Sequence, residues 1–181
     1  MNNETQIHGV AVMGVVWSAD RVSPLFGRKI RHLLADRGIT TLEQTETYPA
    51  EAVVGSISEI AREFGSKPVA SAGAVMAREA STQSECETSY AALQRLAELP
   101  EDWFDDPAEQ YPIGRYTLEK EGSREARLGV TDAFPYPPDI TKGSIRGALV
   151  STGASPLRIE RTRPRQSEQF AYYIKWNDDP E

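Results

Sequence analysis

A strand near the end of the chain constrains the fold more than any other feature of the sequence. Four large apolar side chains recur at every second position of residues 170–176: Phe170, Tyr172, Ile174 and Trp176. Because side chains along a strand point alternately to opposite faces, this pattern predicts a sheet with one buried side. A sheet of that kind needs a cover, and residues 139–153 are predicted to form a short helix that supplies it.

The surrounding residues predict a hairpin–helix–hairpin module. Residues 116–120 and 124–130 are strand-like segments around a turn at Glu121-Gly122. The last hairpin is expected to turn near residues 164–167. Gly143 and Gly147 lie one helical turn apart, which predicts that the helix packs close to the sheet.

The residues before this module predict a mainly helical lobe. Residues 7–17 are apolar and rich in β-branched side chains, so we expect a buried first strand there. Four helices should follow, with bounds set by serine, proline and glycine: 24–38, 49–65, 68–80 and a fourth after Ser84, whose spacing to Glu87 matches a capping box.

The chain of 181 residues suits a single domain. Its expected parts are a helical lobe over 7–98, an ordered acidic linker over 99–115 and the sheet and helix module over 116–176. The predicted fold class is α+β, in which an N-terminal helical lobe with a first strand packs on a C-terminal antiparallel sheet.

The composition of the chain restricts which partners it can bind and where in the cell it is expected. The net charge of −7 argues against a general nucleic-acid-binding surface. No apolar run approaches the roughly 20 residues of a membrane span, and the first residues do not resemble a signal peptide. Cys86 is the one cysteine, which fits a reducing environment. We therefore expect a cytoplasmic protein that binds neither nucleic acid nor membrane.

Residue types that carry catalysis or metal binding are scarce. The two histidines, His8 and His32, are expected at a strand edge and on a solvated helix surface. Cys86 lies between Glu85 and Glu87, whose carboxylates favour the neutral thiol. Without a cluster of cysteines and histidines, we expect no zinc site.

The acidic linker is expected to be solvated and not to hold a cation. Its carboxylates do not follow the spacing of a calcium loop, and Pro107 would interrupt a helix that aligned them: Asp102, Asp105, Asp106 and Glu109. The chain also has no phosphate-binding loop and no serine in a nucleophile elbow. We expect no enzymatic activity.

Two basic strips are candidate partner surfaces. The first lies on the first predicted helix: Arg28, Lys29, Arg31 and Arg37. The second lies near the last hairpin: Arg158, Arg161, Arg163 and Arg165. A solvated face is the simpler interpretation of each strip, and a docking surface for an acidic partner is the alternative.

The order of these elements resembles a superfamily that includes the haem nitric-oxide/oxygen-binding (H-NOX) domain and the 4-vinyl reductase domain. The chain is most similar to a paralogous family of that superfamily, uncharacterised and expanded in myxobacteria. The likeness spans most of the chain and rests on three groups of segments: Gly-Val-Val-Trp at 14–17; Arg-Gly-Ile at 37–39 with Tyr-Pro at 48–49 and Ala-Arg-Glu-Phe-Gly at 61–65; and Gly-Ala-Leu at 147–149 with Thr-Gly-Ala at 152–154 and Tyr-Tyr-Ile-Lys-Trp at 172–176.

The departures from that superfamily imply its scaffold without its metal chemistry. The haem-binding branch attaches iron through a histidine in the middle of the chain, and residues 95–115 contain none. Its Tyr-x-Ser-x-Arg motif is matched at 116–120 only by Tyr116, because leucine and lysine replace the serine and arginine. The chain also lacks the cysteine cluster of the zinc-binding 4-vinyl reductase sensors. We expect no haem and no other cofactor.

Relatives in this superfamily enclose an apolar cavity between the lobes, which suggests a sensor of a small apolar molecule. Seven aromatic residues are candidates to line it: Trp17, Phe26, Phe64, Trp103, Phe104, Tyr116 and Phe134. The same residues could simply fill the core. The alternative hypothesis is an adaptor for a signalling protein, or a homodimerising domain, without a ligand.

Overall fold

The computed structural model describes residues 4–105, 114–131 and 136–178. These residues form an α+β fold, as predicted. The N-terminal elements are β1 (Gln6–His8), α1 (Gly9–Val22), α2 (Pro24–Asp36), β2 (Thr47–Pro49) and α3 (Ala50–Phe64). The others are α4 (Ser66–Gln83), α5 (Ser89–Trp103), β3 (Phe104–Asp105), β4 (Tyr116–Gly122), β5 (Glu125–Thr131), α6 (Pro138–Ser151), β6 (Ser155–Thr162) and β7 (Glu168–Asn177).

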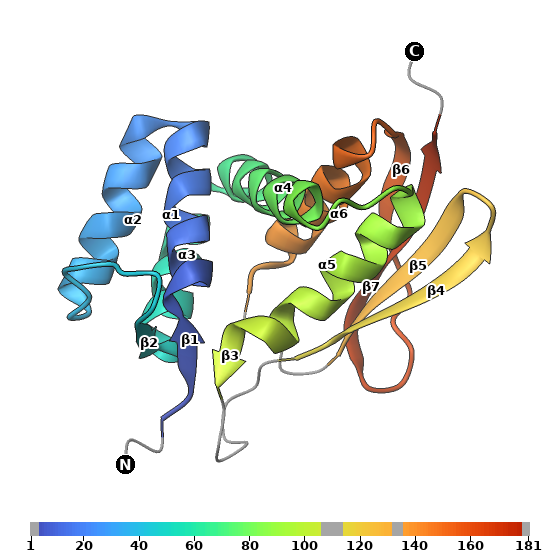
Figure 1. Ribbon diagram of the computed structural model, residues 1–181. Coiled ribbons are helices and arrows are strands. Elements are labelled where there is room, and N and C mark those ends of the chain that lie inside the picture. Colours follow the sequence, from blue (N-terminus) through green and yellow to red (C-terminus); the bar gives the residue numbers. More distant parts are fainter. Residues whose placement is uncertain (1–3, 106–113, 132–135, 179–181) are drawn as a thin grey trace.

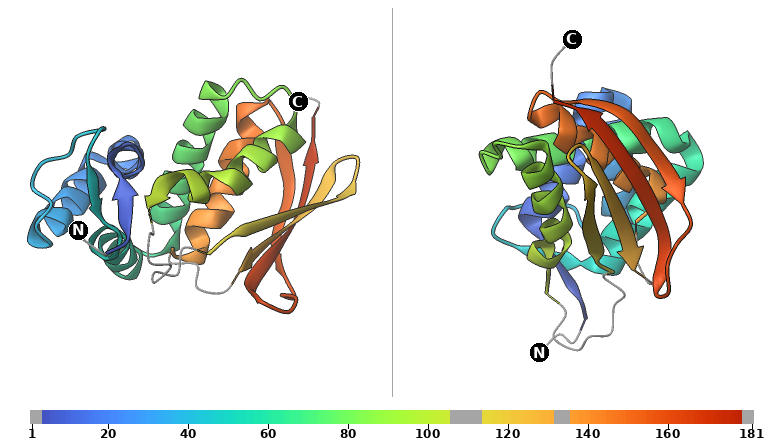
Figure 2. Two further views of the ribbon diagram at one scale, coloured as in Figure 1. Left: turned by 60° about the horizontal axis from the view of Figure 1, so that its bottom comes forward. Right: turned by 90° about the vertical axis from the view of Figure 1, so that its right-hand side faces the viewer.

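The helices α1, α2 and α3 lie at one end of the molecule and the larger sheet lies at the other, with α4, α5 and α6 between them (Figures 1 and 2). The larger sheet has four antiparallel strands in the order β4-β5-β7-β6. A small sheet in the order β2-β1-β3 joins the start of the chain to the end of α5. The expected hairpin–helix–hairpin module is therefore confirmed.

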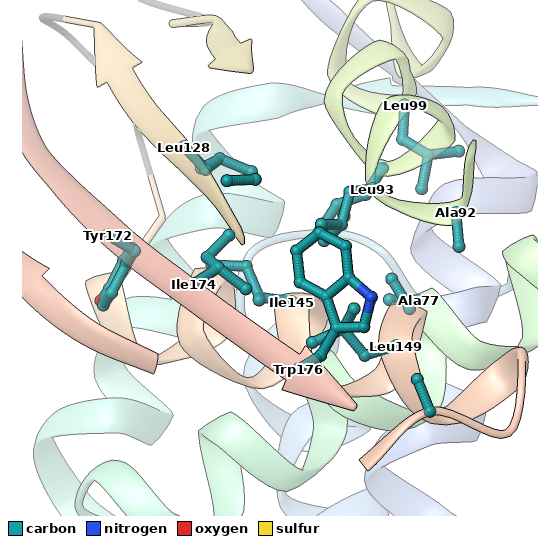
Figure 3. Packing of buried hydrophobic residues seen from close by; sticks show 14 of the residues in the cluster. Ala77, Ala92, Leu93, Leu99, Leu128, Ile145, Leu149, Tyr172, Ile174 and Trp176 are labelled. Carbon is teal, nitrogen blue, oxygen red and sulfur yellow. The ribbon is translucent and has the colours of Figure 1, made fainter. Parts of the chain in front are cut away.

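The alternation that predicted a half-buried sheet is confirmed in β7. The four apolar side chains are at most 3% exposed: Phe170, Tyr172, Ile174 and Trp176. Trp176 packs among Ala77 of α4, Leu93 of α5 and Leu149 of α6 (Figure 3). The cover of the sheet is thus broader than the single helix α6 that the sequence predicted.

The prediction of a strand over residues 7–17 is wrong beyond His8. Helix α1 begins at Gly9, whose amide donates to the Glu46 carbonyl at 2.7 Å. Its buried residues recur at helical spacing, whereas Val10 and Trp17 are 55% and 56% exposed. Strand propensity of β-branched residues is weak against tertiary packing, and here the packing of one helical face prevails.

The caps of α2 and α3 are close to those predicted. The hydroxyl of Ser23 accepts a hydrogen bond from the Leu25 amide at 3.2 Å, and Pro24 occupies the first turn of α2. Gly38 and Gly65 end these helices with φ angles of 87° and 79°. Only glycine adopts that left-handed conformation without strain.

The predicted capping box before α5 is wrong. Thr88 caps α5 by accepting a hydrogen bond from the Ala91 amide at 3.1 Å, while the Ser84 hydroxyl donates to the Ala80 carbonyl at 2.9 Å. Helix α5 then continues to Trp103, inside the predicted linker. Residues 106–113 of that linker lie outside the described part of the chain.

The glycines of α6 pack against α4 and not against the sheet. A Cβ atom on Gly143 would lie 1.8 Å from the Ala70 carbonyl oxygen, and one on Gly147 would lie 2.0 Å from that of Ala74. Likewise, a Cβ atom on Gly73 of α4 would lie 2.4 Å from the Ile140 carbonyl oxygen of α6. The two helix backbones therefore meet at small residues, which joins the helical lobe to the module over 116–176.

Candidate functional site

A small apolar cavity lies where the two hydrophobic core clusters of the protein meet. One cluster joins the larger sheet to α5 and α6, and the other joins α1, α2 and α3. Trp103 and Tyr136 pack against both clusters. The cavity has a volume of about 50 Å³ and is lined from six helices, one strand and the segment before α6: Val15, Ala19, Phe26, Ile30, Ile57, Ile60, Val69, Ala72, Gly73, Met76, Ala77, Leu96, Leu99, Trp103, Tyr116, Tyr136, Ile140 and Ser144.

The polar groups at the cavity wall are neutral and take part in hydrogen bonds. The hydroxyls of Tyr116 and Thr141 lie 3.1 Å apart, and the Ser144 hydroxyl donates to the Gly73 carbonyl at 3.3 Å. Burial raises the pKa of Tyr116, so its phenol stays protonated at neutral pH. Because none of the lining residues is charged, the cavity favours an apolar molecule with at most one polar group.

The cavity includes Phe26, Trp103 and Tyr116 from the seven predicted residues. Phe64 is not one of the lining residues, and its ring packs edge-on against that of Phe26, with ring centroids 5.9 Å apart. Phe104 is also outside it, and its ring lies 6.3 Å from that of Tyr136.

The remaining two predicted residues are Trp17 and Phe134. Trp17 is 56% exposed on α1 and is not among the residues that line the cavity. The residue lies on the solvent-facing side of a helix that the sequence predicted as a buried strand. Phe134 lies outside the described residues.

Sequence reasoning missed the contribution of α4 to the cavity wall. Small residues on one face of this helix leave room between it and its neighbours: Val69, Ala72, Gly73 and Ala77, with Met76 beside them. The richness of residues 68–80 in alanine and glycine was the available signal, because such residues fill little of the space between packed helices.

The cavity and its lining residues do not fit haem. Pockets that hold cofactors typically measure about 300–1,000 Å³, far above this volume, and the lining contains neither histidine nor cysteine. His8 lies 3.5 Å from Asp105 in the small sheet, and His32 lies 3.5 Å from Asp36 with its side chain 70% exposed. Neither histidine lines the cavity. Within the described ranges, no group of three histidine, cysteine or acidic residues is placed to hold a metal ion.

The basic strip on α2 is largely neutralised by acidic neighbours. Lys29 pairs with Glu63 at 2.8 Å, and Arg37 pairs with Glu59 at 2.8 Å. Arg31 makes a two-pronged ion pair with Asp20 of α1, which lowers the pKa of that carboxyl. Arg28 is left exposed. The strip therefore ties α2 to α1 and α3 more than it offers free charge to a partner.

Of the helices in the described segments, none is both long enough and apolar enough to span a bilayer.

The sequence matches no protein-family profile, and no curated protein is significantly similar to it. Solved structures, in contrast, match over nearly the whole chain. The unliganded Fe(II) H-NOX protein from K. algicida shares 8% identity, covers 95% of this chain and 97% of its own, and gives a TM-score of 0.64. The H-NOX protein from S. oneidensis in the Fe(II)NO state shares 9% identity over 91% and 98% of the chains, with a TM-score of 0.63.

A third match is an oxygen-binding H-NOX domain related to soluble guanylate cyclases, in its oxygen complex. It shares 12% identity over 95% of each chain and gives a TM-score of 0.61. Together these matches show that the chain has the H-NOX fold. At such low identity they carry no residue roles, because function resides in particular side chains and not in the fold.

Proposed function

We propose that the chain is a non-enzymatic sensory or regulatory domain that binds a small apolar molecule between its two lobes, without haem. One observation carries this proposal: an uncharged, almost wholly apolar cavity at the point where the two core clusters meet. The matched H-NOX structures, described as an oxygen complex and as an NO-ligated protein, support ligand binding on this scaffold. We also place the chain in the myxobacterial paralogous family, on its shared motifs, and in the cytoplasm.

The size of the cavity sets the class of ligand. An apolar engineered cavity of about 150 Å³ binds benzene or xenon and otherwise stays dry. A volume of about 50 Å³ therefore suits a molecule of a few atoms, unless the wall moves. Met76 is the adaptable part of the wall, since a thioether side chain changes rotamer at low cost. We expect xenon and short hydrocarbons to bind, and small aromatic molecules to bind where Met76 yields.

A position between the lobes also fits a sensory role. Side chains from α1, α2 and α3 form one part of the wall, and side chains from α5, β4 and α6 form another. A molecule that contacts both parts has a different affinity for each arrangement of the lobes, and that difference is what shifts a conformational equilibrium.

The direct test is binding followed through Trp103, which lines the cavity. The chain has three tryptophans, so Trp17→Phe is introduced to remove the exposed one, while Trp176 stays buried in the cluster between the larger sheet, α5 and α6. Xenon, short hydrocarbons, indole and haemin are then titrated, with thermal shift as a second measurement. We expect saturable changes for at least one small apolar molecule and no Soret band with haemin.

A cavity-filling variant is the control. Ala72→Leu adds volume to the wall, whereas Ala35→Leu makes the same change at an exposed position of α2. The first variant should abolish binding and the second should preserve it. Equal binding by both variants, or binding of none of the small molecules by the parent, would contradict the proposal.

A further inference from the structure

A second depression, open to solvent, lies on the other side of α4 and α6 from the cavity. We call it the basic groove. It has a volume of about 660 Å³ and runs between α4, α6 and the start of β6. Its lining residues are Lys67, Ala70, Ser71, Ala74, Lys142, Gly143, Arg146, Pro156, Leu157, Arg158 and Ile159. Helix α6 lies beside both α4 and β6 (Figure 1).

The groove is positive on a protein that is negative as a whole. Four of its lining residues are cations and none is acidic, although the net charge of the chain is −7. Within the described part of the chain, no carboxylate lies at ion-pair distance from Lys67, Lys142 or Arg146, although Lys142 is near enough to Glu160 to help lower the pKa of that carboxyl. Arg158 pairs with Glu160 at 2.7 Å and contributes less free charge. This differs from the strip on α2, whose cations are mostly paired.

The floor and one end of the groove are apolar. Close packing of Gly143 on Ala70 brings the two helices together and leaves the groove shallow between their outer side chains. Leu157, at an irregularity in the pairing of β6, is 62% exposed at the groove. Val150, which is 43% exposed, follows Arg146 by one helical turn on α6. Exposed apolar side chains beside unpaired cations are typical of an interaction surface.

We propose that the basic groove binds an acidic, amphipathic segment of a partner protein. Lys142 and Arg146 are four residues apart on α6, so their side chains emerge about 5–6 Å apart. Carboxylates one helical turn apart on the partner match that spacing, while its apolar residues cover Leu157 and the groove floor. This binding mode, in which an amphipathic helix lies in a groove, recurs in peptide recognition.

Charge and shape favour a short protein segment over larger polyanions. Nucleic acid and anionic membranes feel the negative field of the whole molecule, whereas a segment inside the groove lies within the screening length of about 8 Å from its cations. A flat bilayer also reaches only the rim of a groove that is bounded by α4, α6 and β6.

The groove shares its helices with the cavity. Helix α4 presents Val69, Ala72 and Met76 to the cavity and Lys67, Ala70 and Ala74 to the groove. The inference does not depend on a ligand in the cavity, because the groove has its own residues and its own test.

The test uses the full chain and a fluorescein-labelled helical peptide with glutamate on one face and leucine on the other, measured by fluorescence anisotropy. Arg146→Glu is compared with Arg62→Glu, which makes the same charge reversal at an exposed position of α3. Arg146→Glu should weaken binding about fivefold or more, and Arg62→Glu should leave it nearly unchanged. Leu157→Ser should also weaken binding, and added salt should weaken it for the parent.

Two controls distinguish binding in the groove from a folding defect and from non-specific adhesion of the peptide. Far-UV circular dichroism checks that each variant folds. The same peptide with glutamine for glutamate should bind much more weakly. Equal effects of Arg146→Glu and Arg62→Glu, equal binding of the glutamine peptide, or no binding by the parent would each overturn the proposal. So would binding of phosphatidylserine vesicles or duplex DNA that is tighter than peptide binding and depends on Arg146.

Discussion

At the scale of single residues, a buried ion pair joins the two central strands of the larger sheet, β5 and β7. Arg127 of β5 donates to both carboxylate oxygens of Glu168 in β7, and the two side chains are 5% and 7% exposed. The Arg165 amide donates a further hydrogen bond to Glu168 at 2.7 Å, which fixes the turn before β7. These contacts lower the pKa of Glu168 from 4.5 to about 2.

This ion pair predicts a loss of stability in acid. A carboxyl whose pKa is lower in the folded state stabilises the fold above its unfolded pKa, near 4.5, and loses that contribution as the pH falls toward 2. The contribution is expected to be about 2 kcal/mol. Glu168→Gln should therefore lower the free energy of unfolding at pH 7 and flatten its pH dependence between pH 4.5 and 2. Urea denaturation at a series of pH values measures this, and an unchanged profile would contradict it.

The hydroxyl groups at the cavity wall give a second prediction at this scale. In Tyr116→Phe, the Thr141 hydroxyl, which is fully buried, loses its partner at 3.1 Å. Leaving a buried hydroxyl without that partner should cost about 1–2 kcal/mol in unfolding free energy. Chemical denaturation measures the loss. Tyr90→Phe makes the same change at a tyrosine of α5 whose hydroxyl has no hydrogen-bond partner among the described residues, so it is the control and should cost less.

At the scale of elements, the close contact between α4 and α6 depends on glycines, which have no side chain to separate the two helices. Gly143→Ala would place a Cβ atom 1.8 Å from a backbone oxygen of α4, so the helices must separate. The expected loss of stability is about 3 kcal/mol or more. Gly14→Ala is the matched control, because the nearest atom, Cγ of Met76, is 3.8 Å away. That variant should be neutral or slightly stabilising, since alanine favours a helix over glycine. Thermal and urea unfolding distinguish the two.

Helix caps explain which elements sequence reasoning could place. Serine, proline and glycine act through local hydrogen bonds and φ angles, so the ends of α2 and α3 followed from nearby residues. The strand predicted over 7–17 failed because the residues of α1 are β-branched and apolar. Their helical form is decided by distant partners such as the carbonyl of Glu46, which accepts from Gly9.

At the scale of the whole molecule, Trp103 joins the two core clusters and forms part of the cavity wall. Trp103→Ala should lower the free energy of unfolding by about 3 kcal/mol, through lost burial and the larger cavity. Added indole should restore part of that stability, because it replaces the missing side chain. Trp17→Ala, at the exposed tryptophan, should cost little and show no rescue. Thermal unfolding with and without indole measures both, and equal responses of the two variants would contradict the cavity assignment.

The candidate site was harder to predict than the fold. Aromatic residues were natural candidates for a cavity wall, and Phe26, Trp103 and Tyr116 are part of it. Trp17 is not, because its helix turns it to solvent. The basic groove was even harder to predict from the sequence, because only Arg158 among its cations belongs to a basic strip in the sequence. Lys67 and Arg146 are 79 positions apart and meet only through the packing of α4 on α6.

The sequence by itself determined the half-buried sheet, the hairpin–helix–hairpin order and the ends of α2, α3 and α6, because alternation and capping act over a few neighbouring residues. Tertiary structure decided that α1 is a helix, that Gly143 and Gly147 face α4, and where the cavity and the basic groove lie. Those features depend on the close approach of segments distant in the chain. A cavity in particular is defined by the space that packed side chains leave empty, and no local pattern encodes that space.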